Sequence, residues 1–152
     1  GLAVLAEYLV GGLSRTRLRL LAGRVVAAHG LEDGAGFVDT YRTLVADFGF
    51  SQRGAFSLAV RTHRSGGFTK DAVYLKGLQK ILEYLGRGEA IEDLFIGKIG
   101  SAHVPIIREL RWRKVLRDPP LVPRYMQRAD SIERLKELSR GLSAMDLIKR
   151  RK

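Results

Sequence analysis

The stretch KDAVYLKGLQKILEYL, residues 70–85, decides the fold class. Apolar side chains recur along it with the period of an α-helix, at Val73, Leu78, Ile81, Leu82 and Leu85. Thr69 stands directly before it and is a suitable N-cap. The pattern therefore predicts a long amphipathic helix from Lys70 to about Leu85.

The chain upstream of this helix also has helical periodicity. Residues 1–10 are almost wholly apolar, which predicts a helix buried on most sides. Ser14 and Ser51 are suitable N-caps for two further helices, the first reaching about Ala28. Residues 36–48 form another predicted helix, and Ser65-Gly66-Gly67 is the strongest loop signal.

The chain downstream continues in the same way. We expect a short helix over 91–96, a helix over 102–116, and an extended connector at Asp118-Pro119-Pro120 and Pro123. Ser131 is a candidate N-cap for a polar helix whose narrow apolar stripe reaches Ile148, so this segment is expected to pack on a partner surface or a neighbouring chain. Strand alternation and internal repeats are absent from the sequence. The predicted fold class is all-α.

Charge is the most informative feature of the composition. The 152 residues include 27 Lys and Arg against 16 Asp and Glu, a formal charge of +11. This excess favours an anionic partner, either nucleic acid, an acidic peptide or an anionic membrane surface. Arginines scattered over helix faces for solubility explain it equally well. The sharpest local excess runs from Arg108 to Arg128.

Several functional classes are excluded or disfavoured. The chain has no cysteine, so it forms neither disulfides nor thiolate metal sites, which is consistent with a cytoplasmic location. No apolar run reaches the roughly 20 residues that span a bilayer. The chain begins Gly-Leu-Ala, without Met and without a signal peptide, so we expect it to be an excerpt of a longer protein.

Cationic side chains gather on both sides of the Ser65-Gly66-Gly67 loop signal. Arg61 and Arg64 share one helix face at a spacing of three, and Lys70 lies in the first turn of the next helix. Three cations near a helix N-terminus suit an anion such as a carboxylate. Tyr74 lies one turn beyond Lys70, on the same face.

A structural explanation of this cluster competes with the functional one. Arg61 and Arg64 could instead pair with Asp71 or Glu83, with Tyr74 as a core residue. The three histidines, His29, His63 and His103, form no convincing zinc set and are each expected to be structural. The sequence also lacks a nucleophile elbow and a glycine-rich phosphate loop.

Two motifs carry a resemblance to a known family. Gly1-Leu-Ala-Val-Leu-Ala-Glu-Tyr-Leu9 resembles the segment that follows Gln-Glu in the flavohaemoglobin expression-modulating QEGLA motif proteins of bacteria. Phe68-Thr-Lys-Asp-Ala-Val-Tyr-Leu-Lys-Gly77 and Gly97-Lys98 resemble the same family. All are also similar to the microtubule-associated tyrosine carboxypeptidases, which remove the C-terminal tyrosine of tubulin. The likeness covers residues 1–125 and leaves 126–152 as a C-terminal helical basic tail.

The resemblance implies a zinc enzyme. Family members hold zinc with two histidines of a His-Glu-x-x-x-His helix and the Glu of the Glu-Gly-Leu-Ala motif, and the helix Glu acts as general base. This chain starts at the Gly after that third ligand and contains no His-Glu pair. We therefore expect a multi-helix C-terminal portion of a zincin-like metallopeptidase domain. Zinc is expected in the intact parent, and none in this fragment, which should be inactive alone.

The resemblance also gives roles to the cationic cluster. Arg61, Arg64 and Lys70 are expected to recognise a substrate carboxylate or acidic tail, and Tyr74 to donate to the oxyanion or contact the substrate side chain. The implied partners are an acidic peptide or protein C-terminus and the missing N-terminal half. No membrane partner is expected, and nucleic acid is disfavoured.

Two other readings stay open at this point. One is a basic helical regulatory or nucleic-acid-binding module, supported by the run from Arg108 to Arg128. The other is a purely structural helical domain whose catalytic half has decayed.

Overall fold

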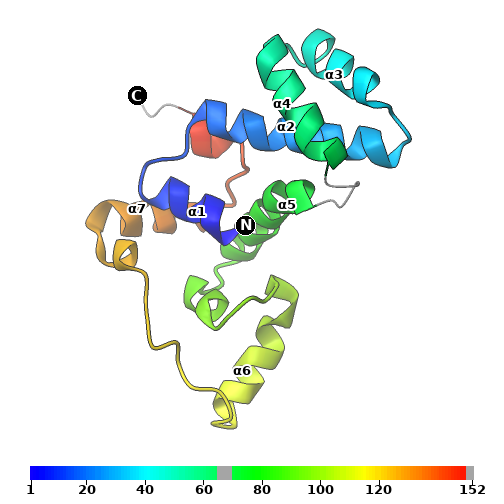
Figure 1. The fold of residues 1–152 in the computed structure, drawn as a ribbon. Helices are drawn as coiled ribbons and strands as arrows, with labels where there is room; N and C mark the ends of the chain where they lie inside the picture. The colour runs from blue at the N-terminus through cyan, green and yellow to red at the C-terminus, as the bar shows by residue number, and fades with distance from the viewer. Residues whose placement is uncertain (65–69, 150–152) are drawn as a thin grey trace. The chain divides into compact units, whose positions relative to one another are not determined.

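The computed structural model describes residues 1–64 and 70–149, and for Lys70 and Asp71 it describes the backbone alone. Within these ranges the chain is all-α and contains no strand (Figure 1). The α-helices are α1 Leu2–Leu9, α2 Arg15–Glu32, α3 Phe37–Ala46, α4 Gln52–Arg64, α5 Lys70–Gly86, α6 Val104–Trp112 and α7 Ala129–Leu138. Short 3-10 helices are η1 Ile91–Phe95, η2 Ser101–His103, η3 Arg124–Gln127 and η4 Asp146–Ile148.

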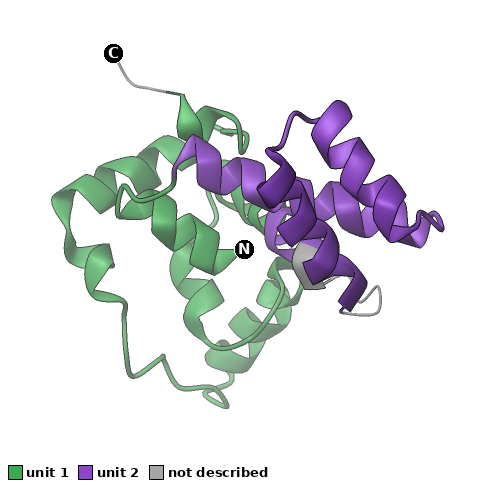
Figure 2. Cartoon of the chain, turned by 45° about the horizontal axis from the view of Figure 1, so that its top comes forward, with its two compact units in different colours: residues 1–13, 78–152 green, residues 14–77 purple. Residues whose placement is uncertain are grey.

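The chain divides into two compact units (Figure 2). One consists of residues 1–13 and 78–152, and the other of residues 14–77. The division falls within α5, between Gly77 and Leu78. The boundary predicted between residues 125 and 126 marks the end of the family resemblance. The division into compact units does not test it, so it stays a prediction. In the described residues no helix is long and apolar enough to cross a membrane.

Helices α2, α3 and α4 form the core of the unit 14–77, where each packs on the other two. The cluster consists of Ala27, Leu44, Ala55 and Leu58, with Val26, Tyr41, Val45 and Phe50 packed around it. Gly23 lets α2 come close to this cluster. A β-carbon placed on Gly23 would lie 2.6 Å from Phe50 Cζ and 2.9 Å from Leu58 Cδ1. The absence of a side chain is therefore a packing requirement.

The unit of residues 1–13 and 78–152 joins the two ends of the chain, because α1 packs on α7. Ser131 was predicted to be an N-cap, and this was wrong: α7 begins at Ala129. Ser131 is 1% exposed inside the helix, and its hydroxyl donates to the carbonyl oxygen of Leu9 at 3.0 Å. The helix also ends at Leu138 rather than near Ile148, and Gly141 follows with a φ of 79°.

Two other predicted helix ends were wrong for a common reason. Helix α2 was predicted to reach about Ala28, but it continues to Glu32 and ends before Gly34, which has a φ of 88°. Helix α6 ends at Trp112, four residues before the predicted end, because Lys114 adopts a φ of 58°. At these two ends the residue with positive φ, Gly34 or Lys114, lies away from the position that the sequence predicted for the end of the helix. The predicted cap Ser14 is confirmed, since its hydroxyl accepts from the Arg17 amide at 3.1 Å.

Candidate functional site

The four predicted site residues all belong to the unit 14–77. Arg61 and Arg64 lie in the last turn of α4, and both are exposed. Lys70 is the first residue of α5, and Tyr74, one turn later, is half-buried. The predicted loop at Ser65-Gly66-Gly67 and the predicted cap Thr69 lie outside the described residues. The structure thus places the four residues at the two helix ends that flank this segment, without bringing their side chains into one described contact.

Cations at the end of α4 also have a structural explanation. Arg61 and Arg64 occupy its last turn, where positive charge interacts favourably with the helix dipole. His63 additionally holds this end in place. Its Nε2 lies 3.1 Å from the hydroxyl of Thr40, and its ring meets Phe37 edge-on at 5.6 Å. These contacts are those of a structural histidine that fixes α4 against α3.

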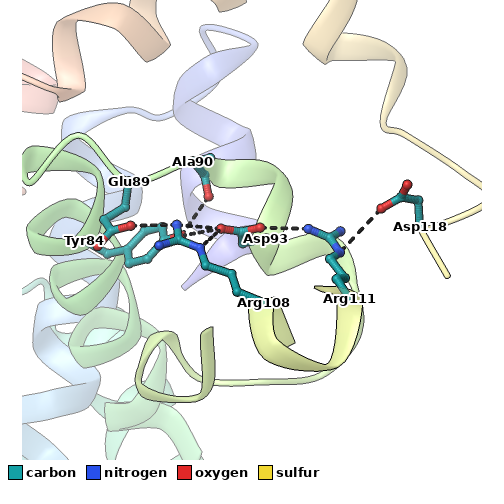
Figure 3. A network of polar contacts seen from close by, with 7 residues as sticks. All are labelled: Tyr84, Glu89, Ala90, Asp93, Arg108, Arg111 and Asp118. Carbon is teal, nitrogen blue, oxygen red and sulfur yellow. Dashed lines mark hydrogen bonds and ion pairs between the residues drawn. The ribbon is translucent and has the colours of Figure 1, made fainter. Parts of the chain in front are cut away.

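A polar network that the sequence analysis missed lies in the other unit and is centred on Asp93 (Figure 3). This residue is 7% exposed and lies in η1. Arg108 Nε donates to its Oδ2 at 2.8 Å, and Arg111 Nη1 donates to its Oδ1 at 2.8 Å. One carboxylate therefore joins two guanidinium groups of α6 to η1. The arrangement suits a buried carboxylate, whose charge must be compensated by donors.

The network extends beyond this carboxylate in both directions. Arg108 Nη2 donates to Glu89 Oε2 at 2.7 Å, and Arg111 Nε lies 3.4 Å from Asp118 Oδ1. The hydrogen bonds to Glu89 and then Asp93 raise the pKa of Arg108. Arg111 Nε is buried and makes no hydrogen bond in the described structure, so its ion pair with Asp118 lacks hydrogen-bond geometry.

Tyr84 closes the network on the side of α5. Its hydroxyl donates to the carbonyl oxygen of Ala90 at 2.8 Å and lies 3.4 Å from Asp93 Oδ2. Burial, followed by the charge of Asp93, raises the pKa of Tyr84 to about 12. The phenol therefore stays protonated at neutral pH and serves as a donor. Through the hydrogen bonds of Tyr84, Arg108 and Arg111, the network ties α5, η1 and α6 together.

This network changes the interpretation of the basic run 108–128. Besides Arg108 and Arg111, Arg113 pairs with Glu109 at 2.6 Å and Arg128 with Asp130 at 2.9 Å. Of the seven cations in the run, Arg108, Arg111, Arg113 and Arg128 thus pair with acids. Two of these acids, Glu89 and Asp93, precede the run in the sequence. The run is therefore a weaker argument for nucleic-acid binding than its sequence implies.

Among the described residues, neither a metal-binding group nor a pocket provides another candidate for the active site. Among the described residues, no group of three or more His, Asp or Glu side chains could hold a metal ion. A pocket of about 150 Å³ in the unit 1–13 and 78–152 is lined by the apolar Leu85, Ile91 and Leu135 and by the acidic Glu89 and Glu92, among others. None of the four predicted site residues lines it.

Comparison with known families decides the relationship. The model of the microtubule-associated tyrosine carboxypeptidase family matches residues 1–144. The chain belongs to this family. The match includes the opening Gly-Leu-Ala segment and the segment around Tyr74, and it extends into the region beyond 125. Comparison with curated proteins and with solved structures gave no match.

Proposed function

We propose that this chain is the substrate-binding C-terminal part of a zinc-dependent, carboxypeptidase-like hydrolase that acts on peptide C-termini. The family match over residues 1–144 carries the proposal. In this view the chain is part of a zincin-like metallopeptidase domain of a cytoplasmic parent protein. Its substrate is the acidic C-terminus of a peptide or protein, which suits the formal charge of +11.

The residues of this chain do not fit a zinc site by themselves. The sequence has no His-Glu pair, and no three-ligand group occurs in the described residues. We therefore propose that the metal ligands and the general base come from an N-terminal half of the parent, and that this fragment alone is inactive. We derive no catalytic step through zinc from these residues.

The proposed contribution of this chain is recognition and charge stabilisation. Arg61 and Arg64 present exposed guanidinium groups at the end of α4, and a guanidinium binds a carboxylate through two parallel hydrogen bonds. Lys70, at the start of α5, adds a third cation. Tyr74 donates its hydroxyl proton either to the developing oxyanion or to the substrate side chain. The exposed arginines support recognition, because their charge is accessible to a substrate.

The test uses the full-length parent and a peptide with an acidic C-terminal tail. Release of the C-terminal residue is followed by mass spectrometry, and zinc content by elemental analysis. Arg61→Met and Arg64→Met are expected to raise KM, and Tyr74→Phe to lower kcat by about 100-fold if it serves the oxyanion. Arg53→Met, on an exposed position of α4, and Tyr41→Phe are the matched controls.

The outcomes separate the parts of the proposal. Stoichiometric zinc and chelator-sensitive release support the hydrolase. A metal-free and inactive parent would instead favour a regulatory protein built on a peptidase fold. Unchanged turnover in Arg61→Met and Tyr74→Phe would leave the hydrolase intact and remove the roles assigned to these residues.

A further inference from the structure

We propose that the segment 112–124, the connector between α6 and η3, contacts an anionic lipid surface. It begins at Trp112, the last residue of α6, and ends at Arg124, the first of η3. Between them, residues 113–123 contain no helix and run as a long loop from α6 towards α7 (Figure 1). The formal charge of +11 left an anionic membrane surface open as a partner, whereas the family resemblance implied no membrane partner. The contact is an addition to the proposed function and does not depend on it.

The first observation is the exposure of apolar side chains. Leu121, Trp112 and Val115 are 82%, 77% and 66% exposed, and they are the three most exposed large apolar residues in the described structure. Val122, in the same segment, is 52% exposed. Isolated exposed apolar residues are common, but four within eleven positions mark a contact surface.

The second observation is unpaired positive charge on the same segment. Lys114, Arg117 and Arg124 are exposed, and no ion pair involves them in the described residues. The other four cations of the run 108–128 all have acidic partners. The cations that remain available are therefore interleaved with the exposed apolar side chains, and no described acid neutralises them.

Lipid fits this combination better than the other anionic partners do. Leucine and valine gain by leaving water for the acyl region, tryptophan favours the bilayer interface, and Lys and Arg reach the anionic headgroups. Nucleic acid would use the cations and could stack on Trp112, but it offers little to Leu121 and Val122. An acidic peptide would likewise engage the charges and leave the aliphatic side chains in water.

The experiment uses the intrinsic fluorescence of Trp112, the only tryptophan of these 152 residues, measured in the full-length parent with any other tryptophan replaced by phenylalanine. Vesicles of phosphatidylcholine mixed with phosphatidylserine are expected to shift its emission to shorter wavelength, and brominated lipid is expected to quench it. Vesicles of phosphatidylcholine alone should bind far more weakly. Emission that is unchanged in the presence of the mixed vesicles would overturn the proposal.

Variants test the two components separately. Lys114→Gln, Arg117→Gln and Arg124→Gln are each expected to weaken vesicle binding by about fivefold. Leu121→Ser with Val122→Ser should abolish quenching by brominated lipid. The controls remove equal charge or apolar surface elsewhere, through Arg42→Gln, Arg53→Gln and Lys80→Gln, and through Val38→Ser with Val73→Ser.

Competing outcomes are distinguishable. If the control set of charge changes weakens vesicle binding as much as the connector set, the contact reflects net charge and the proposal fails. Tighter binding to a DNA duplex or to polyglutamate than to mixed vesicles, with loss in the connector variants, would assign the surface to those partners instead. Circular dichroism of each variant checks that the helices are retained.

Discussion

Arg134 donates from Nη1 to the carbonyl oxygen of Leu9 at 2.6 Å, although 125 positions separate the two residues. The same oxygen accepts the hydroxyl of Ser131 at 3.0 Å. Leu9 is the last residue of α1, so its carbonyl has no partner within the helix. A cation at this end also interacts favourably with the helix dipole. The first helix of the chain is thus held by the segment predicted to be a tail.

Replacement of Arg134 should therefore loosen α1. Arg134→Met keeps much of the aliphatic stem and removes the donors, and we expect it to lower the free energy of unfolding by about 1 to 3 kcal/mol. Urea denaturation followed by circular dichroism measures the change. Arg140→Met, at an exposed position just past α7, is the control and should be nearly neutral. Equal effects of the two substitutions would contradict the importance of the Leu9 contact.

The sequence predicted the fold class and most helices because their signals are local. Period and capping depend on residues a few positions apart, as at Ser14, whose cap is present. Helix ends were less predictable. The end of α6 depends on a lysine in a conformation that glycine usually adopts, and the burial of Ser131 depends on its contact with Leu9. Neither has a local signature.

The residues of the candidate site and of the polar network also divide into those with a local sequence signal and those whose contacts are distant in the sequence. The residues Arg61, Arg64, Lys70 and Tyr74 were found from local spacing and family likeness, and their roles stay predictions. The network of Asp93 was missed because its partners Arg108 and Arg111 lie 15 and 18 positions away. An aspartate within the apolar stretch Ile91-Glu-Asp-Leu-Phe-Ile96 was the available signal, since a buried acid requires donors.

Asp93 should be much more important for stability than Asp118, although both pair with Arg111. Asp93→Asn removes the charge that two guanidinium groups share, and we expect a loss of about 1.5 to 3 kcal/mol. The side chain of Asp118 is 89% exposed, so Asp118→Asn should cost less than about 0.5 kcal/mol. Thermal and urea unfolding compare the two variants. A larger effect at Asp118 would show that the network is organised around the surface pair instead.

Lys114→Gly should stabilise the chain. The amides of Lys114 and Val115 bond to the carbonyls of Arg111 and Leu110, each at 2.9 Å, which is the Schellman pattern of a helix end. Helices α1 and α2 end in the same pattern, with glycine at the positive φ position. A lysine is strained there, so its replacement should raise the free energy of unfolding by about 0.5 to 1 kcal/mol.

The neighbour of Lys114 provides the control. Arg113 has a φ of −74°, so Arg113→Gly relieves no strain and should destabilise α6. Chemical denaturation of both variants is the measurement. If Lys114→Gly is as destabilising as Arg113→Gly, Lys114 carries no backbone strain at this helix end.

Two glycines of α2 should respond to alanine in opposite directions. A β-carbon on Gly23 would come within 3 Å of both Phe50 and Leu58, closer than side chains approach one another, so one helix must move. We expect Gly23→Ala to cost about 1 to 3 kcal/mol, as overpacking in a core usually does.

At Gly30 the nearest atom is Ala35 Cβ, at 3.7 Å, which is an ordinary contact. Gly30→Ala should therefore stabilise α2 by about 0.5 to 1 kcal/mol, because alanine restricts the unfolded chain and favours the helix. Thermal unfolding of the two variants measures both signs, and destabilisation by both would mean that helix packing around Gly30 is tighter than described.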